Sequence, residues 1–434
     1  MALNVFREQW KVGSLDMHVD EPFFGFTYDM EYLHSKAAQP LSLSLPLAPS
    51  RYTGKQTQPY FEGLLPESQA REAIARRLGI PRNSSVKLLV ALGRDCAGDV
   101  SIIDEGEEPG YDSASNRNPS YSLLEGGLSR IAENPLEEVT GLVEDTRLSL
   151  AGGQEKISLY HDPDASMKEG WYKSAPGSPS THILKPGILE AYYPCITLNE
   201  FLCLRVAAAC GLKVVHVDIA FLDNPVLIIE RYDRQFNGAM VDGFQVVRRI
   251  HQEDCCQACG VIPDFKYEHD GGPGFKQIRD LLTMYSKSPV EDISMLVKWA
   301  LFNYLVGNCD AHAKNLSLLH NGDGTISLAP TYDIKSTAVY NSRFGTKLSR
   351  GMGMRIGMHE NIDKVNAQDL ILFAQEIRMR PQQIKSMGEE IIRKLSPAFS
   401  TACLVAQREG FKEAGDMADR IMNGCNQRAT ILLS

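Results

Sequence analysis

The chain has 434 residues, of which 43% are hydrophobic and 23% charged; this is the composition of an ordinary globular protein, with length for two or three packed subdomains. A formal net charge of −9 gives no support to a freestanding nucleic-acid binder, because phosphate neutralisation needs a basic face. The N-terminus lacks the apolar core of a secretory signal and no run approaches the ~20 apolar residues that span a bilayer, so we expect a cytoplasmic protein without membrane segments.

The N-terminal part favours a β-containing subdomain. The segment "FGFTYD" (24–29) and the Leu/Ser alternation of "PLSLSLPL" (40–47) have the pattern of short, half-buried strands. Residues 104–120 are acidic, rich in Ser, Asn and Pro, and poor in apolar side chains. Such a segment buries little surface, and we interpret it as a linker or long loop.

Residues 147–235 alternate between strand-like segments, a glycine turn and one helix. The helix is predicted from "TLNEFLCLRVAAACG", in which Thr197 and Glu200 have the spacing of a capping box and Gly211 stands where a C-terminal cap is expected. The alternative for Glu200 is an ion pair with a strand lysine, and we favour the cap. The strand "NPVLIIERYDR" follows the helix.

Three features of this region suit a nucleotide. The glycines of "SLAGGQEKISL" let backbone amides approach a phosphate. Lys185, at the end of the strand in "STHILKPG", could neutralise phosphates, although strand lysines are more often solvated edge residues. Glu230 and Tyr232 end the last strand before a helical lobe, where an adenine could lie between two lobes.

From Gln252 onward the apolar spacing is mainly helical, in "VEDISMLVKWALFNYLVG", "NAQDLILFAQEIRM" and "PQQIKSMGEEIIRKL", with a hairpin predicted at 317–334. The cysteines of "EDCCQACG" lack a second CxxC or paired histidines, so we interpret this segment as a helical packing motif and assign no metal to it.

Polar residues gather in "GNCDAHAKNLSL" (307–318), directly after an apolar helix. Asp310 and Asn315 have the D-x-x-x-x-N spacing of a protein-kinase catalytic loop, and Asp333 follows the hairpin. Phosphoryl transfer from ATP needs one carboxylate to orient the acceptor hydroxyl, and a carboxamide and a second carboxylate to hold magnesium. An Asp or Asn in a loop often only stabilises a turn of the backbone, so the spacing alone is weak evidence for a kinase. The upstream features that suit a nucleotide make the kinase interpretation stronger.

Ordered motifs along nearly the whole chain resemble the HipA family of bacterial serine/threonine kinase toxins. The N-terminal segments "QPLSLSLPL", "FEGLLPES" and "GRDCAGDV" resemble those of the family. The segments "SLAGGQEK", "THILKP", "IERYDR", "QEDCCQACG", "KYEHDGGPG", "GNCDAHAKN" and "PTYDI" resemble its kinase core.

The resemblance implies a role for each matching residue. It makes Asp310 the catalytic base or orienter, Asn315 and Asp333 the magnesium ligands, and Ser149 the autophosphorylated serine. The residues implied to bind ATP are Ala151, Gly152, Gly153, Gln154, Glu155 and Lys156 in the phosphate loop, Lys185, His312 and Lys314 on the phosphates, and Glu230 and Tyr232 at the adenine hinge.

The chain departs from these patterns at two points. The loop reads "AGGQEK", and at one of these positions the family commonly has an alanine; this difference should loosen the loop modestly. The segment "YDI" lacks the Phe-Gly that follows the corresponding aspartate in eukaryotic-like kinases. For "KYEHDGGPG" (266–274), the residues alone predict a rigid loop, which the resemblance places near the active cleft.

The resemblance also implies partners. These are a HipB-like helix-turn-helix antitoxin, operator DNA bound mainly through that antitoxin, and a protein substrate in translation such as an aminoacyl-tRNA synthetase. The alternatives are a catalytically silent corepressor that binds the antitoxin, and a hydrolytic metal centre of Asp310, His312 and Asp333.

We therefore expect a kinase-like two-lobed fold, with an α/β N-terminal part followed by a mostly α-helical C-lobe. Its expected divisions are a β-containing subdomain and linker at 1–120, a kinase-like N-lobe at 121–250, and a helical C-lobe at 251–434.

Overall fold

The computed structural model describes residues 2–107, 109, 119–146, 151–343 and 346–433. The chain divides into two units. The first comprises Met1–Pro186, Glu230–Asp264 and Leu319–Gly324, and the second comprises Gly187–Ile229, Phe265–Leu318 and Thr325–Ser434. Ser149 and most of the acidic segment 104–120 lie outside the described residues.

The first unit begins with a four-stranded antiparallel sheet in the order β3-β2-β1-β4. Its elements are β1 (Ala2–Arg7), β2 (Trp10–Asp16), β3 (Gly25–Tyr28), α1 (Met30–His34), α2 (Gly54–Gly63), α3 (Ser68–Arg77), α4 (Ser85–Leu92) and β4 (Val100–Asp104). Apolar side chains of the sheet and of α2 and α4 form one core. The β-containing subdomain expected from the sequence is therefore confirmed, and β3 is the strand predicted from "FGFTYD".

The strand predicted at residues 40–47 is wrong, because the polar groups of this segment bond to residues 253–257 instead of to a neighbouring strand. The Ser42 hydroxyl and the Leu43 N–H donate to the carboxylate of Glu253, and the Ser44 hydroxyl donates to the Gln257 carbonyl at 2.7 Å. The alternation of Leu and Ser belongs to a loop in which leucines are buried and serines form hydrogen bonds to residues in and next to α8 (Cys255–Ala258). That helix confirms the packing role expected for "EDCCQACG".

The first unit also contains four neighbouring strands of a six-stranded sheet, in the order β5-β7-β6-β8. Its elements are β5 (Tyr121–Leu123), α5 (Gly127–Glu133), α6 (Pro135–Thr146), β6 (Ile157–His161), β7 (Trp171–Ser174) and β8 (His182–Pro186). Helix α6 packs against β6, β7 and α3. Strands β11 (Arg234–Val241), β12 (Phe244–Arg249) and β13 (Gln252–Asp254) complete this unit.

Buried carboxylates of the first unit pair with arginines. Asp99 pairs with Arg7 at 3.0 Å, and the His251 Nδ1 atom lies 2.7 Å from the Asp99 carboxylate, which connects the N-terminal segment to residues 230–264. Asp233 pairs with both Arg231 and Arg234. Burial alone would raise the pKa of each aspartate, but the arginine charges outweigh it and hold both pKa values below their ordinary range.

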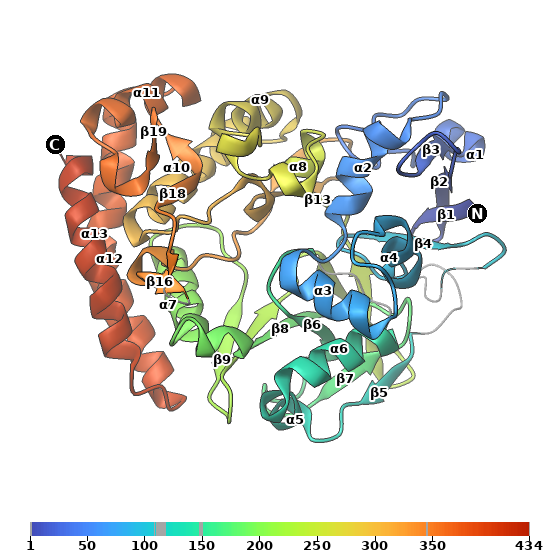
Figure 1. Cartoon of the computed structure of the whole chain (residues 1–434), viewed down its shortest axis with the longest axis horizontal. Helices are drawn as coiled ribbons and strands as arrows, with labels where there is room; N and C mark the ends of the chain where they lie inside the picture. Colours follow the sequence, from blue (N-terminus) through green and yellow to red (C-terminus); the bar gives the residue numbers. More distant parts are fainter. Residues whose placement is uncertain (1, 108, 110–118, 147–150, 344–345, 434) are drawn as a thin grey trace. The chain divides into compact units, whose positions relative to one another are not determined.

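The second unit is mostly helical, as expected. Its elements are α7 (Ile196–Ala209), β9 (Val217–Ala220), β10 (Val226–Glu230), α9 (Phe275–Tyr285), α10 (Pro289–Val306), β14 (Ser317–His320), β15 (Ile326–Leu328), β16 (Ser342–Arg343), β17 (Thr346–Lys347), β18 (Gly351–Ile356), β19 (His359–Asn361), α11 (Ala367–Ile377), α12 (Pro381–Arg408) and α13 (Ala414–Leu433). The long helices α12 and α13 lie side by side (Figure 1). The predicted helices correspond to α10, α11 and α12.

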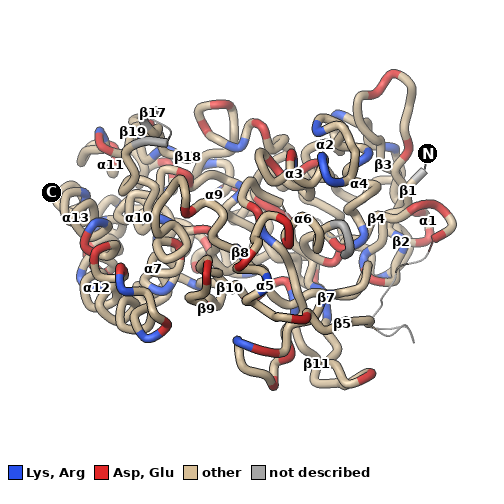
Figure 2. The backbone as a smooth tube through the Cα atoms, turned by 60° about the horizontal axis from the view of Figure 1, so that its bottom comes forward, with Lys and Arg blue, Asp and Glu red and all other residues tan. Residues whose placement is uncertain are grey.

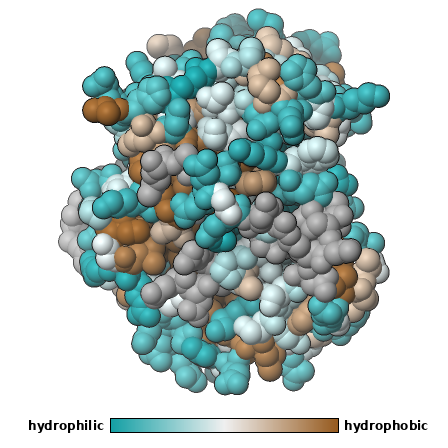
Figure 3. Space-filling model, turned by 90° about the vertical axis from the view of Figure 1, so that its right-hand side faces the viewer, coloured by the Kyte–Doolittle hydropathy of each residue, from teal (hydrophilic) through white to brown (hydrophobic). Residues whose placement is uncertain are grey.

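The surface carries charges of both signs. Acidic and basic residues are interspersed along the backbone (Figure 2), and on the face in Figure 3 apolar side chains form small groups within a mainly hydrophilic surface. Within the described part of the chain, no helix combines the length and apolar character needed to cross a membrane.

Candidate functional site

The polar loop 307–316 of the second unit starts at the end of α10. Gly307 adopts a left-handed conformation (φ 78°), and its N–H donates to the carbonyls of Asn303 and Tyr304, which ends the helix. The Asn308 side chain then donates to that of Asn303 at 2.7 Å and accepts the N–H of Asp310 at 3.1 Å. The helix end thus fixes the position of Asp310.

Asn315 closes this loop back on Asp310. Its Nδ2 donates to the Asp310 carbonyl at 3.0 Å, and its backbone N–H donates to the His312 carbonyl at 2.9 Å. The side chains of His312, Lys314 and Asn315 are all buried. The structure therefore brings together the four polar residues that the sequence singled out in this loop.

The carboxylate of Asp310 is the exposed group of the loop. Its side chain is 38% exposed, while Tyr267 donates a 2.6 Å hydrogen bond to its Oδ1 atom. The His312 ring lies edge-on to the Tyr267 ring, with its Nε2 atom 3.9 Å from the same Oδ1. Asp310 is thus oriented by a neighbour yet open to a reactant.

Tyr267 belongs to the segment 266–274, which forms a tight turn. Gly271 has a left-handed conformation (φ 100°), and a Cβ on Gly272 would lie 2.4 Å from the Phe265 carbonyl oxygen. The Glu268 carboxylate also accepts the Arg355 N–H at 2.8 Å. The rigid loop expected here is confirmed, and its contact with Asp310 is the role that the residues alone did not reveal.

Asp333 follows β15 and joins the same group of residues. It has a left-handed conformation (φ 56°), which is unfavourable for a residue other than glycine and is concentrated at functional positions. The preceding Tyr332 donates its hydroxyl to the Lys314 carbonyl at 2.8 Å. This bond connects the Asp333 segment directly to loop 307–316.

Lys335 is a neighbour of Asp333 that the sequence analysis missed. Its Nζ donates to the Asp333 Oδ1 at 2.6 Å, and its side chain is only 12% exposed. Burial lowers the pKa of Lys335, but the negative charges of Asp333, Glu200 and Asp310 outweigh burial and raise the pKa above its ordinary value. Lys335 therefore carries a full positive charge among three carboxylates.

Helix α7 holds the segment that follows Asp333 in place. The Asn199 side chain both accepts the Ser336 N–H at 2.8 Å and donates to the Ser336 carbonyl at 2.9 Å. The capping box predicted for Thr197 and Glu200 is wrong: the N-cap of α7 is Cys195, two residues before Thr197, and the Glu190 carboxylate accepts the Thr197 N–H at 2.9 Å. Because Glu190 supplies the cap, Glu200 is free of that role and is buried within the electrostatic reach of Lys335.

Strand β18 contacts loop 307–316 closely at Gly353. The Gly353 N–H donates to the Cys309 carbonyl at 2.8 Å. A Cβ on Gly353 would lie 2.7 Å from the Ala311 carbonyl carbon and 2.8 Å from the His312 nitrogen. Only glycine allows this approach.

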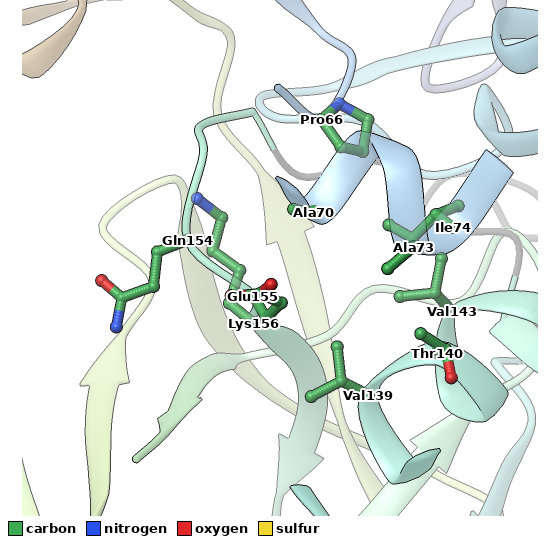
Figure 4. Close-up of a pocket in the computed structure, with 10 residues that line it drawn as sticks. All are labelled: Pro66, Ala70, Ala73, Ile74, Val139, Thr140, Val143, Gln154, Glu155 and Lys156. Atoms are coloured by element: carbon green, nitrogen blue, oxygen red, sulfur yellow. The ribbon is translucent and has the colours of Figure 1, made fainter. Parts of the chain in front are cut away.

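The predicted phosphate-loop residues 151–156 lie in the first unit. Gly152 has a left-handed conformation (φ 106°), and its carbonyl accepts the Glu67 N–H at 3.0 Å. Gln154, Glu155 and Lys156 line a small, mostly apolar pocket with residues of α3 and α6 (Figure 4). Glu155 is buried there, and among the described residues its Oε2 atom has no hydrogen-bond partner.

Lys185, Glu230 and Tyr232, which were also predicted to bind the nucleotide, lie in the first unit as well, whereas His312 and Lys314 lie in the second. Lys185 is a buried residue of β8, contrary to the solvated edge position usual for strand lysines. Glu230 is exposed at the end of β10, and Tyr232 donates its hydroxyl to the Gln252 side chain at 2.7 Å. The predicted site residues thus form two groups, one in each unit, and Ser149 lies outside the described residues.

The donor atoms near Asp333 fit magnesium, which takes oxygen ligands and usually keeps waters and substrate phosphates in its shell. Asp333 offers a carboxylate, and Asn315 offers its carboxamide oxygen because its Nδ2 is bonded to Asp310. Among the described residues, no group of three or more His, Cys, Asp or Glu side chains could hold a metal ion. A site with two protein oxygens suits a metal that arrives with a nucleotide better than a resident hydrolytic metal.

Comparisons with known proteins agree with this arrangement. The model of the HipA N-terminal domain matches residues 3–103, and that of the HipA-like C-terminal domain matches residues 148–399. The chain is 38% identical to "Putative kinase Y4mE" of Sinorhizobium fredii, over 86% of this chain and 85% of that protein. It is 28% identical to "Serine/threonine-protein kinase toxin HipA" of Shewanella oneidensis, over 90% of this chain and 88% of that protein.

A solved structure shows the same fold. It is the Shewanella oneidensis complex of HipA, HipB and operator DNA, whose matching chain is 24% identical with a TM-score of 0.79; the match covers 99% of this chain and 98% of that chain. The kinase-like α/β fold with a helical C-terminal part is therefore confirmed.

Proposed function

Because the chain belongs to the HipA family and is a kinase, we propose that it transfers the γ-phosphoryl group of ATP to a serine or threonine of a protein substrate. The observation that carries the proposal is the grouping of Asp310, Asn315 and Asp333 in the second unit, with Asp310 open to a reactant. This set of a carboxylate, a carboxamide and a second carboxylate is what phosphoryl transfer requires.

Asp310 is the group that meets the acceptor hydroxyl. Its Oδ1 atom is held by Tyr267, which leaves the second carboxylate oxygen to accept the hydroxyl proton. Asn315 and Asp333 would hold Mg²⁺, which would supply positive charge against the negative charge that develops on the transferred phosphoryl group. We assign the ATP phosphates to residues 151–156, Lys185, His312 and Lys314, and the adenine edge to Glu230 and Tyr232.

We further propose that the kinase is the toxin of a toxin–antitoxin pair and modifies a component of translation, such as an aminoacyl-tRNA synthetase. Its partner would be a HipB-like antitoxin that holds it on operator DNA, by analogy with the Shewanella oneidensis complex. The acidic net charge of −9 supports DNA contact mainly through a partner. Ser149 is the proposed autophosphorylation site, where a phosphate would place about two negative charges beside the loop that receives ATP.

The test is an incubation of phosphatase-treated protein with Mg²⁺ and γ-labelled ATP, followed by mapping of the label by mass spectrometry. We expect label on Ser149, and none in the Asp310→Gln variant although this variant still binds ATP. Ser149→Ala should remove the main self-label but keep transfer to a substrate. ATP binding without any labelling of self or of translation proteins would instead support a silent corepressor.

A further inference from the structure

Lys335 holds a place in the candidate site that packing does not explain. Its ammonium group lies 2.6 Å from Asp333, and its side chain is 12% exposed. Burying a cation costs several kcal/mol unless a partner is close and well oriented. The segment does not need this lysine to stay in place, because Asn199 already holds Ser336 through both of its backbone groups.

Three carboxylates have the largest influence on the charge of Lys335, and two of them belong to the proposed catalytic group. Asp333 is bonded to it directly, and Glu200 and Asp310 also act on its charge. Three carboxylates with one ammonium leave two net negative charges, whereas the carboxylates alone would leave three. Affinity for a hard divalent cation rises with the number of such negative ligands.

We propose that Lys335 is a positioning residue that acts as a built-in counter-ion. It binds one oxygen of Asp333, so that the other faces the magnesium site, and it reduces the negative charge that would otherwise attract metal without nucleotide. This inference rests on the proposed function, since it assigns Asp333 to Mg²⁺. In this arrangement the site accepts magnesium mainly together with ATP, whose phosphates supply the missing negative ligands.

The first test measures free Mn²⁺ binding by electron paramagnetic resonance without nucleotide, which requires no turnover. Lys335→Met should bind Mn²⁺ about tenfold more tightly than the unmodified chain, because one nearby positive charge is lost. Its rate of phosphoryl transfer should fall about tenfold or more, because the Asp333 carboxylate loses its orientation. Lys335→Arg, which keeps the charge, should restore the Mn²⁺ affinity and part of the rate.

The control is Lys394→Met. Lys394 also lies 2.6 Å from a carboxylate, that of Glu390, but this pair is on the surface of α12. Its removal should leave both Mn²⁺ binding and the transfer rate unchanged. If Lys335→Met leaves Mn²⁺ binding unchanged, the counter-ion role is wrong. If it weakens ATP binding instead, Lys335 is a phosphate ligand and the proposal is equally wrong.

A measurement on the unsubstituted chain covers the case in which Lys335→Met does not fold. The chain is labelled with ¹³C at the lysine Cε atoms and studied by NMR, and the Lys335 signal is the one that disappears in Lys335→Arg. Paramagnetic Mn²⁺–ATP should broaden this signal strongly, whereas diamagnetic Mg²⁺–ATP should not. An unbroadened Lys335 signal, with Mn²⁺–ATP bound, would overturn the proposal. Neither binding test depends on catalysis, so a chain that transfers no phosphate would refute the proposed function while the role of Lys335 is still decided.

Discussion

The Tyr267 hydroxyl donates a 2.6 Å hydrogen bond to the Asp310 carboxylate, although 43 positions separate the two residues. The bond comes from a turn whose shape depends on Gly271 and Gly272. A hydrogen bond to an ionised carboxylate is shorter and stronger than one between neutral groups. It restricts Asp310 to one orientation before any substrate arrives.

Removal of this hydroxyl should slow phosphoryl transfer without weakening ATP binding. A hydrogen bond to a charged group contributes about 1.5–3 kcal/mol, so Tyr267→Phe should lower kcat by about 10- to 100-fold. Steady-state kinetics with a protein substrate, together with calorimetric titration of ATP, measure both quantities. Tyr285→Phe, at the exposed end of α9, is the control and should leave kcat unchanged. An unaltered kcat in Tyr267→Phe would show that Asp310 is oriented by other contacts.

Asn199 should be needed for stability as well as for magnesium use. Asn199→Ala removes both bonds to Ser336 and leaves buried backbone groups without partners, which should cost about 2–4 kcal/mol of unfolding free energy. The Mg²⁺ concentration that gives half-maximal activity should also rise, because the Asp333 segment loses its support. Urea unfolding and a Mg²⁺ titration measure the two effects.

The matched control for Asn199 is Asn361→Ala. The Asn361 side chain accepts only one local hydrogen bond, from the Asp363 N–H at 2.9 Å in a 3₁₀ turn, so its loss should cost about 1 kcal/mol. Similar losses in the two variants would contradict a special role for Asn199.

Gly353 provides a steric test of loop 307–316. In Gly353→Ala, the new methyl group would meet the backbone at Ala311 and His312 and displace the loop. A misplacement of about 1 Å in a catalytic group can cost about 100-fold in rate, so activity should fall far more than stability. Gly322→Ala, whose added Cβ would meet nothing within 4 Å, should keep the original rate. Full activity in Gly353→Ala would mean that the loop shifts to accommodate the methyl group without displacing the catalytic residues.

The sequence predicted the features that depend on residues close together in the chain. Helices α10, α11 and α12 follow from apolar spacing, and the place of Asp310 follows from the helix that ends at Gly307. The spacing of Asp310 and Asn315 also suffices to bring them together, because a single turn joins them.

Most contacts that the sequence did not predict depend on how separate segments fold together. Tyr267 lies 43 positions from Asp310. Lys335 is only two positions from Asp333, but nothing in the sequence indicates that Glu200 and Asp310 also act on its charge. The capping-box prediction for α7 was wrong because Glu190, outside the predicted helix, reached its first N–H groups. The strand predicted at 40–47 was wrong because Glu253 and Gln257, more than 200 positions away, bond to its serines.

The buried aspartates of the first unit predict a loss of stability in acid. The folded-state pKa of Asp99 and of Asp233 lies below the ordinary value, so the unfolded chain binds more protons than the folded chain at low pH. Their contribution is therefore complete at neutral pH, begins to decline below about pH 5, and continues to fall as the pH approaches their folded-state values. Urea unfolding of the first unit at a series of pH values measures this decline.

Asp233→Asn isolates one of the two carboxylates. At pH 7 the variant should lose about 3–5 kcal/mol, because the buried charge of Arg231 loses its carboxylate and that of Arg234 is left with Asp95 alone of its two carboxylates. Its stability should also depend less on pH below about pH 5, because one titrating group is gone. Glu72→Gln, in an exposed pair with Arg76 on α3, should cost less than about 1 kcal/mol. Equal costs for the two variants, or an unchanged acid dependence in Asp233→Asn, would show that the buried network is not what stabilises this unit.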